Sequence, residues 1–396
     1  MMNPRLSKLV SQLAESETIA MTRKSNELRA KGVDVISMSL GEPDFPTPQH
    51  IKDAAKKAID NNISHYAPVA GFPELRKAIV NKFRIENSLT YKPENIMVSN
   101  GAKHTITNIL MALLNPGNEV ILPAPYWVSY REMVKLAGGV NRIIKAGIEQ
   151  EFKITPRQLD EAISNKTKVL ILNSPSNPSG SVYSEQELTA LAEVIKKYPN
   201  LFVISDEVYE HIMYEGEHFS LAQIDDIKEQ VIVVNSVSKS YAMTGWRIGY
   251  MAGPEWLVNA CTNLQGQVTS GANSIAQMAA IAALTGPNDS IVKMKDIFMA
   301  RRNILVETFN SINGVKVMNP KGAFYLFPDV SGLFNKKLNN RLIRNSDDLS
   351  WYLLEEANVA TVPGSAFGTP ECIRLSYATS DENIKTAMER IKSKIK

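Results

Sequence analysis

Short runs of Val, Ile and Leu that alternate with helical patterns constrain the fold of this chain more than any other feature. The runs lie at 95–98, 119–122, 168–172, 201–204, 231–234 and 247–251, and the helical patterns between them at 102–114, 130–137 and 184–197. Strands that are apolar on both faces need helices on both sides to cover them. The alternation therefore predicts an α/β fold with a mainly parallel central sheet.

A change of pattern near residue 288 indicates a second structural unit. Residues 286–289 form a turn signal, and a long helical pattern then runs to about Asn310. The remaining residues mix short strand patterns with an amphipathic C-terminal helix whose apolar face contains Ile384, Ala387, Met388 and Ile391. We predict a large domain at 46–288 and a smaller α+β domain at 289–396, with residues 1–45 forming an N-terminal arm and part of the smaller domain.

The N-terminal residues carry a helical apolar pattern of their own. Leu6, Leu9, Val10 and Leu13 recur at the spacing of one helix face. They predict a short arm that docks on this chain or on a partner. The first residues lack the apolar core of a signal peptide, and no apolar run approaches the ~18 residues of a membrane-spanning helix. We therefore expect a cytoplasmic protein that does not enter a membrane.

The charge balance and the cysteine content argue against several classes of partner. Lys and Arg number 44 against 41 Asp and Glu, which gives a net charge of +3. So weak a charge predicts neither nucleic acid nor a membrane surface as the partner. Cys261 and Cys372 are too few for a disulfide framework, and five scattered histidines show no metal-binding spacing. We expect a reducing compartment and no metal site.

A lysine follows one predicted buried strand at the place where α/β sheets bind ligands. Ser236, Ser238 and Lys239 come directly after the strand at 231–234. Ligands of open α/β sheets bind at the carboxyl ends of the strands. A lysine amine in this position can form a Schiff base with a carbonyl compound. An isolated loop lysine is more often a solvated surface residue, so the neighbours of Lys239 decide between the two interpretations.

Two further strands bring polar residues to the same rim. Asp206 and Tyr209 follow the strand at 201–204, and Asn177 follows the strand at 168–172 through a sharp Asn-Pro turn. A carboxylate at this rim could pair with a protonated pyridine nitrogen. These neighbours favour the Schiff-base interpretation of the lysine.

A candidate anion site begins at the helix start that follows the strand at 95–98. The residues that would form it are Gly101, Ala102, Lys103, Ser236, Ser238 and Arg247. Backbone N–H groups and the helix dipole favour a negative charge at a helix start, and an arginine adds a fork of donors for phosphate. A glycine before a helix is common, so the pattern gains weight only together with the lysine and the aspartate.

Several ordered motifs extend over nearly the whole chain. They are Gly41–Phe45, Tyr66–Pro68 with Gly71, Pro125–Tyr130, Asn177–Gly180, Ser205–Tyr209, Ser238–Lys239, Gly245–Gly249, Val362–Gly364 and Ile373–Ala378. In this combination the sequence resembles the class I aminotransferases, which use pyridoxal 5'-phosphate (PLP), and most of all the bacterial aspartate aminotransferases. The resemblance implies the fold of PLP-dependent transferases, with a large PLP-binding domain and a smaller α+β domain.

The resemblance also implies a role for each rim residue. Lys239 would form the Schiff base with PLP, Asp206 would pair with the pyridine nitrogen, Asn177 and Tyr209 would hold the 3-oxygen of the ring, and Trp127 would stack on its face. The phosphate would be held by Gly101, Ala102, Ser236, Ser238 and Arg247, with Lys103 beside them and Tyr66 reaching in from the partner subunit. Such shared sites imply a homodimer. Without the resemblance, Trp127 has an alternative interpretation as a core aromatic, and Tyr66 could equally be a turn or interface residue.

The substrate carboxylates have separate candidates. The resemblance assigns the α-carboxylate to Arg374, Gly41 and Asn177, beside Trp127, and a planar guanidinium suits bidentate binding. Many aspartate aminotransferases hold the distal carboxylate with an arginine after the Trp-Arg-Ile-Gly segment, but residues 248–300 contain no Arg. Lys103 is the candidate that replaces it, with hydroxyls of Ser16 and Thr18 from the arm. Lys103 could instead only balance the phosphate charge.

The implied reaction is the transfer of the amino group of aspartate, or of a similar L-amino acid, to 2-oxoglutarate in ping-pong order. Lys239 would be the base that moves the Cα proton of the substrate. Prephenate is an alternative acceptor, and a carbon–sulfur β-lyase is an alternative reaction on the same fold. A PLP-sensing transcription regulator would need a DNA-binding module, and a nicotinamide dehydrogenase would need a Gly-x-Gly-x-x-Gly turn, which the sequence lacks.

Overall fold

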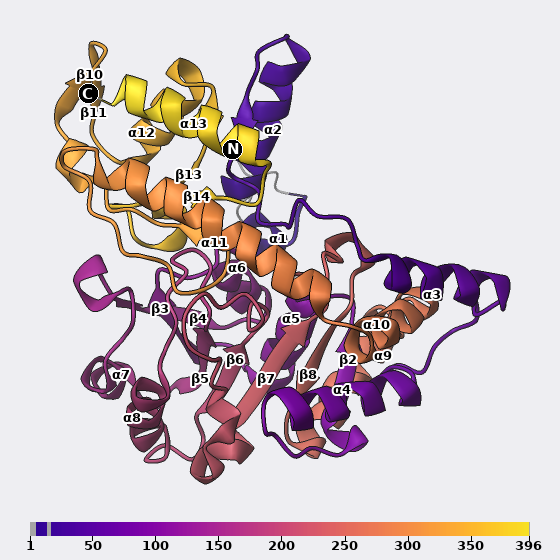
Figure 1. Cartoon of the computed structure of the whole chain (residues 1–396). Helices are drawn as coiled ribbons and strands as arrows, with labels where there is room; N and C mark the ends of the chain where they lie inside the picture. The colour runs from indigo at the N-terminus through magenta and orange to yellow at the C-terminus, as the bar shows by residue number, and fades with distance from the viewer. Residues whose placement is uncertain (1–4, 14–16, 396) are drawn as a thin grey trace.

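A seven-stranded sheet forms the centre of the larger part of the molecule (Figure 1). The computed structural model describes residues 5–13 and 17–395. The strands of the sheet, in the order in which they lie side by side, are β2 (Ile96–Ser99), β8 (Gly249–Ala252), β7 (Val231–Ser236), β6 (Phe202–Asp206), β5 (Thr167–Asn173), β3 (Glu119–Ala124) and β4 (Val140–Lys145). Within this sheet β8 alone runs antiparallel to its neighbours, so the predicted mainly parallel sheet is confirmed.

Helices cover both faces of the sheet because its central strands are apolar on both faces. One layer contains α3 (Gln49–Asp60), α4 (Pro73–Glu86), α7 (Pro156–Ala162), α8 (Glu185–Ile195) and α10 (Ser274–Thr285). The opposite layer contains α5 (Ala102–Leu113), α6 (Ser129–Leu136) and α9 (Glu255–Val268). In β7, Val231 and Val233 are buried in the first layer, whereas Ile232 and Val234 are buried in the second. Successive side chains of a strand point to opposite faces, so an unbroken apolar run satisfies both layers.

The predicted runs all correspond to strands or helices, whose ends differ from the prediction by one or two residues. The edge strand β4 was not predicted. Among its residues only Ile144 is buried, so the run lacks the continuous apolar pattern of the central strands. The strand β8 begins two residues later than predicted because Arg247 adopts a φ of +57°, which no strand residue can have.

A second hydrophobic core joins the C-terminal part of the chain to a segment near the N-terminus. It contains α11 (Asp289–Asn310), α12 (Ser346–Glu356), α13 (Asp381–Lys394), β9 (Tyr325–Leu326), β10 (Lys336–Leu338), β11 (Arg341–Ile343), β12 (Val359–Ala360) and β14 (Ile373–Ser376). The short strand β1 (Ile36–Ser37) pairs in parallel with β12, and β13 (Val362–Pro363) pairs with β14. In Figure 1 this part lies above the large sheet, and α11 leads into it. The boundaries at 45/46 and 288/289 stay a prediction.

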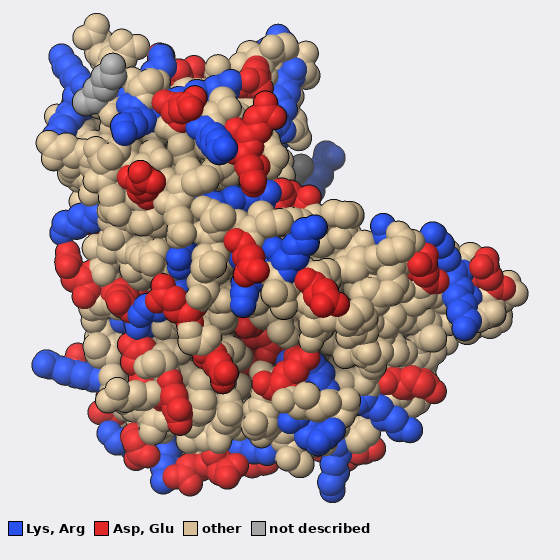
Figure 2. Space-filling model, in the orientation of Figure 1, with Lys and Arg blue, Asp and Glu red and all other residues tan. Residues whose placement is uncertain are grey.

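The N-terminal region forms α1 (Lys8–Ser11) and α2 (Glu17–Ala30), and Ser16 lies outside the described residues. Leu6, Leu9 and Val10 are 52%, 40% and 50% exposed, so their docking on a partner stays a prediction. No helix in the described part of the chain is long and apolar enough to cross a membrane. Figure 2 shows acidic and basic side chains mixed over the visible face.

Candidate active site

A cavity of about 410 Å³ opens where the carboxyl ends of three sheet strands meet the C-terminal part of the chain. Asn173, Asp206 and Ser236, the last residues of β5, β6 and β7, all line it. The predicted site residues that line the cavity are Gly41, Ala102, Lys103, Trp127, Asn177, Asp206, Tyr209, Ser236, Ser238, Lys239, Arg247 and Arg374. Parallel strands direct their carboxyl ends to one edge, and this common direction brings together residues that are far apart in sequence.

Two predicted residues do not line the cavity. Gly101 lies directly beside it as the N-cap of α5, next to Ala102. Tyr66 is 97% exposed in the connection between α3 and α4. An exposed tyrosine there is available to a second chain, so its expected cross-subunit role stays a prediction.

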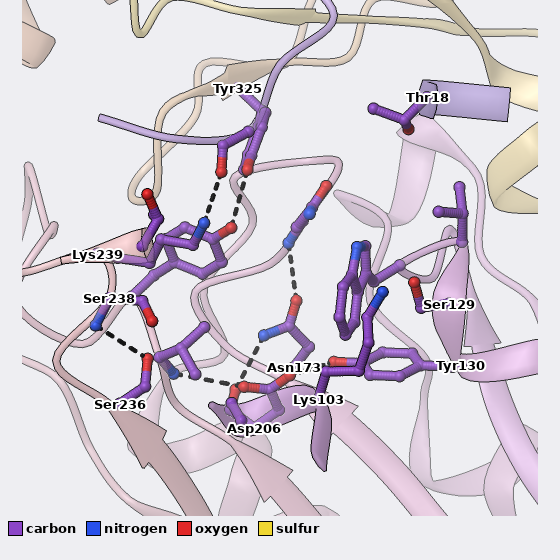
Figure 3. A pocket seen from close by; sticks show the side chains of 18 of the residues that line it. Thr18, Lys103, Ser129, Tyr130, Asn173, Asp206, Ser236, Ser238, Lys239 and Tyr325 are labelled. Carbon is purple, nitrogen blue, oxygen red and sulfur yellow. Dashed lines mark hydrogen bonds between the residues drawn. The ribbon is translucent and has the colours of Figure 1, made fainter. Parts of the chain in front are cut away.

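Lys239 lies in the turn that follows β7 and projects into the cavity (Figure 3). Its Nζ donates a hydrogen bond to the carbonyl oxygen of Gly41 at 2.5 Å. Burial lowers the pKa of the Lys239 amine to about 8; Glu42 opposes this shift, and Arg247 and Arg374 add to it. Much more of the amine is therefore neutral near neutral pH than for an ordinary lysine, as nucleophilic attack requires.

Asp206 lies at the bottom of the cavity and is almost fully buried. Burial raises the pKa of its carboxyl to about 6, against the lowering effect of a hydrogen bond from Tyr130. The Tyr130 hydroxyl donates to Oδ2 of Asp206 at 2.5 Å. A cation placed against this carboxylate would lower its pKa and favour the charged form. The site thus offers a buried acceptor for a protonated nitrogen.

Arg374 and Asn177 form the side of the cavity near β9. Nη1 of Arg374 donates to Oδ1 of Asn177 at 2.9 Å, and Nη2 donates to the carbonyl of Ser39 at 2.6 Å. Its guanidinium lies 4.8 Å from the ring centre of Tyr325, which holds its plane. Among the described residues, Nε of Arg374 has no hydrogen-bond partner although it is buried. A planar guanidinium that lines the cavity fits an incoming carboxylate.

The start of α5 forms the opposite, positively charged end of the cavity. Gly101 has a φ of +86°, and a Cβ atom there would come within 2.1 Å of Nη2 of Arg247. Gly249 is equally constrained, because a Cβ would come within 2.2 Å of the backbone nitrogen of Ala102. The two glycines therefore let Arg247 approach the free N–H groups at the helix start. Such an arrangement binds phosphate or another anion.

Lys103 extends along the same end of the cavity. Its Nζ lies 4.9 Å from the ring centre of Trp127, a cation–π contact. Burial lowers the pKa of the Lys103 amine, and the nearby charge of Arg247 lowers it further. Two cations that repel each other beside a helix start are stabilised by an anion between them.

Comparisons with known proteins identify the family. The sequence profile described as aminotransferase class I and II matches residues 33–391. The chain belongs to this aminotransferase family. It is 47% identical to the aspartate/prephenate aminotransferase of Nitrosomonas europaea, with 98% of this chain and 99% of the relative covered. It is 48% identical to the aspartate aminotransferase of Bacillus sp. (strain YM-2), with the same coverage of 98% and 99%.

Solved aminotransferase structures share its fold. The aspartate aminotransferase of Rhizobium meliloti superposes with a TM-score of 0.96 at 41% identity, covering 99% of each chain. The aspartate aminotransferase of Thermus thermophilus with maleate superposes with a TM-score of 0.93 at 41% identity, covering 99% of this chain and all of that one. The predicted transferase fold is confirmed.

Some residues of the aminotransferase cavity were not predicted from the sequence. They are the lining residues Ile19, Val128, Ser129, Tyr130, Asn173, Val208, Thr244 and Tyr325. Thr18, which was predicted from the N-terminal arm, lines the cavity as well. The hydroxyl groups of Tyr325 and Tyr209 share a hydrogen bond of 2.8 Å. The Tyr325 hydroxyl also lies so close to Gly41 that a Cβ atom there would come within 2.4 Å of it. Tyr325 follows a Pro-Lys-Gly turn, and an aromatic residue after this turn was the only sequence feature that could have indicated a residue of the site. Tyr130 stands in a motif that the resemblance already included, but its aim at Asp206 depends on tertiary packing.

Proposed function

We propose that this aminotransferase moves the amino group of aspartate, or of a similar L-amino acid, to 2-oxoglutarate with PLP bound at Lys239. The observation that carries the proposal is the convergence of Lys239, Asp206 and Arg374 on one cavity. The names of its relatives support aspartate as the donor. The fold by itself does not define the substrate.

The cavity residues fit PLP by their charges. The start of α5, Ser236, Ser238 and Arg247 would hold the phosphate. The absence of a Cβ atom at Gly101 leaves room for the guanidinium of Arg247 at this end. Asp206 would hold the pyridine nitrogen, while Asn177 and Tyr209 would hold the 3-oxygen. Trp127 would cover a ring face. When bound, PLP supplies an aldehyde that amines attack and a ring that accepts electrons from the substrate.

Lys239 does the acid–base work of the reaction. With its lowered pKa of about 8, the neutral amine would hold the cofactor, and as a free amine it would lie beside the substrate. The freed Nζ can then take the proton from the substrate Cα. The carbonyl of Gly41, which accepts a hydrogen bond from Nζ at 2.5 Å, orients the amine.

Arg374 and Lys103 divide the carboxylates of a dicarboxylic substrate between them. Arg374 binds the α-carboxylate, helped by Gly41 and Asn177, because it lines the cavity and its planar guanidinium can bind a carboxylate with two hydrogen bonds. Lys103 binds the distal carboxylate from the far end of the cavity, and Thr18 also lines the cavity (Figure 3). The relative from Thermus thermophilus was solved with maleate, itself a dicarboxylate. Ser16 lies outside the described residues.

The enzyme works as a homodimer in the cytoplasm. The exposed Tyr66 and the exposed apolar residues Leu6, Leu9 and Val10 are the surfaces that support an interface. Tyr66 would complete the phosphate site of the partner subunit. Prephenate is a second candidate acceptor, since the relative from Nitrosomonas europaea is an aspartate/prephenate aminotransferase.

One experiment tests cofactor and substrate together. The purified protein is incubated with excess PLP, reduced with borohydride and digested, and the peptides are mapped. The cofactor is expected on Lys239, and its presence on another lysine, or on none, would refute the mechanism. A second portion of the PLP-loaded protein, neither reduced nor digested, is assayed with a panel of amino acids and with 2-oxoglutarate or prephenate. Aspartate is expected to be the best donor with 2-oxoglutarate.

A further inference from the structure

A buried ion pair lies behind the cavity, between α4 and the turn that follows β6. The ammonium group of Lys82 contacts the carboxylate of Glu210, and the two side chains are 0% and 3% exposed. Lys82 also donates to Oδ1 of Asn87 at 2.7 Å, and Nδ2 of Asn87 donates to the second Glu210 oxygen at 2.8 Å. Neither Lys82 nor Glu210 lines the cavity. Burying two charges costs several kcal/mol per ion, and apolar residues of the same size would pack as well.

Hydrogen bonds continue from this pair to the segment that carries Lys239. Nδ2 of Asn235 donates to Oε1 of Glu210 at 2.6 Å. The backbone N–H of Ser236 in turn donates to Oδ1 of Asn235 at 2.7 Å. Ser236 lines the cavity, and Lys239 follows it by three residues. The charge of Glu210 is thereby connected to the peptide group at the entry of this segment.

A second branch holds the other end of the same segment. His211 shares a hydrogen bond of 2.8 Å with the hydroxyl of Ser240 and another of 2.9 Å with Oε2 of Glu86. The ammonium of Lys82 lies 3.6 Å from that same Glu86 oxygen. Segment 236–240 is therefore attached at both ends to groups that surround one buried ammonium. If the groups at the two ends of this segment served only for packing, they would not need to be charged.

The network also joins two segments that face the cavity. Glu210 belongs to the turn that follows Asp206 and contains Tyr209, so the ion pair fixes this turn relative to segment 236–240. Glu86, Glu210 and His211 bring ligand atoms within 4.8 Å of one another, as metal ligands do. The ammonium of Lys82 lies among these groups and supplies a positive charge there.

We propose that Glu210, held in its charged form by Lys82, is a positioning residue that acts through Asn235 on Ser236 and Lys239. It keeps the segment in the place where the Lys239 amine is shielded from water beside Gly41. The effect on cofactor affinity rests on the proposed function, whereas the effect on the amine does not. Loosening the segment admits water to the amine, and hydration raises its pKa toward that of an ordinary lysine.

The test compares Asn235→Ala and Glu210→Gln with a matched control, Ser220→Ala. The control removes a buried hydrogen bond to a neighbouring carboxylate, from Ser220 Oγ to Oε1 of Glu207 at 2.8 Å, and the other hydrogen bonds of Ser220 are to Ala222 and Gln223. In each cofactor-free protein, the rate at which trinitrobenzenesulfonate modifies Lys239 is followed against pH by peptide mapping. The dissociation constant of PLP is measured separately.

We expect Asn235→Ala to raise the pKa of the Lys239 amine by roughly 0.5 to 1 and to weaken PLP binding about three- to tenfold, as the loss of one net hydrogen bond would do. Glu210→Gln is expected to shift both quantities in the same direction by less, because its amide oxygen still accepts from Asn235. Ser220→Ala should lower stability and leave both quantities unchanged. A pKa and an affinity that stay at their wild-type values in the two network variants would overturn the proposal.

A paired variant covers the case in which the single variants fail to fold. Lys82→Met with Glu210→Gln removes both charges at once and leaves neither unpaired. If this variant folds and the Lys239 pKa still rises, the buried charges position the segment; an unchanged pKa reduces the network to packing. If wild-type Lys239 itself does not bind PLP, the proposed function fails, but the pKa comparison in the cofactor-free proteins still decides the role of Glu210.

Discussion

Two shielded lysines flank the segment after β7, and they differ in the charges around them. Lys239 faces the cavity, where its nearest hydrogen-bond partner is the neutral carbonyl of Gly41, and Arg247 and Arg374 lower its pKa further. Lys82 lies behind the same segment, with the carboxylate of Glu210 in contact. Although burial alone would raise it, the pKa of Glu210 is held well below its ordinary range by Lys82, His211 and His218.

The comparison shows that the counter-charge, more than burial, decides what a shielded lysine can do. A lysine without a carboxylate loses its proton more easily and becomes a nucleophile or a base. Lys82 instead forms an ion pair with Glu210 and donates to Asn87, and it thereby fixes the groups around it. Three predictions test this difference and a fourth concerns the substrate carboxylates; they are described from the largest expected effect to the smallest.

Substitution of Lys239 should lower activity far more than substitution of Lys82. Lys239→Met removes both the amine that holds PLP and the base for the Cα proton, so turnover of aspartate and 2-oxoglutarate is expected to fall by at least roughly 10⁴-fold. Lys82→Met leaves both groups in place and should retain measurable turnover. The oxaloacetate released is measured for both variants in excess PLP. Full activity in Lys239→Met would contradict the assignment of the base.

Substitution of Lys82 should lower stability more than any other of these substitutions. Lys82→Met leaves Glu210 buried without its cation, so the free energy of unfolding is expected to fall by about 3 to 5 kcal/mol. Urea denaturation of the cofactor-free protein measures the loss. The control is Lys82→Met combined with Glu210→Gln, which should recover most of it. An unchanged midpoint in the single variant would mean that Glu210 finds water or another cation.

The corresponding substitution of Lys239 should raise the free energy of unfolding, whereas that of Lys82 lowers it. The amine has a pKa of about 8 in the folded protein and about 10.4 when unfolded, so between these values the unfolded chain binds more protons. The contribution of Lys239 to wild-type stability therefore rises as the pH increases from about 8 to 10.4. Lys239→Met should stabilise the cofactor-free protein by up to about 3 kcal/mol at pH 7, and this gain should disappear by about pH 10.4. A gain that does not vary with pH would indicate better packing of Met instead.

The smallest of these effects concerns the two ends of the substrate. Lys103→Ala should lower kcat/KM for aspartate and glutamate by about 1.5 to 3 kcal/mol, roughly 10- to 150-fold, because one charge-assisted hydrogen bond is lost. Alanine and phenylalanine have no distal carboxylate and should be spared. Steady-state kinetics with the four donors provide the measurement. An equal loss for all four would assign Lys103 to the cofactor phosphate.

The local sequence was sufficient to predict most strands and helices of the large sheet. Each central strand is an apolar run because both of its faces are buried, as Val231 to Val234 illustrate. The edge strand β4 escaped prediction because one buried residue among exposed neighbours gives no such run. Similarly, β8 begins later than predicted because Arg247 has a positive φ. The contact of Arg247 with Gly101 at the start of α5 stabilises this conformation.

By itself, the sequence determined which residues follow which strand. Because parallel strands end at one edge, this order alone predicted that Asp206, Ser236 and Lys239 would meet. Only the tertiary structure decided what stands behind them, since Lys82 on α4 and Glu210 on a distant turn share no motif or spacing. A buried ion pair depends on the distance between two charges in space and on the water excluded around them, and neither is encoded in a local pattern. The same reason explains why Lys239 and Lys82, two lysines in one sequence, acquire opposite chemistry only when the chain is folded.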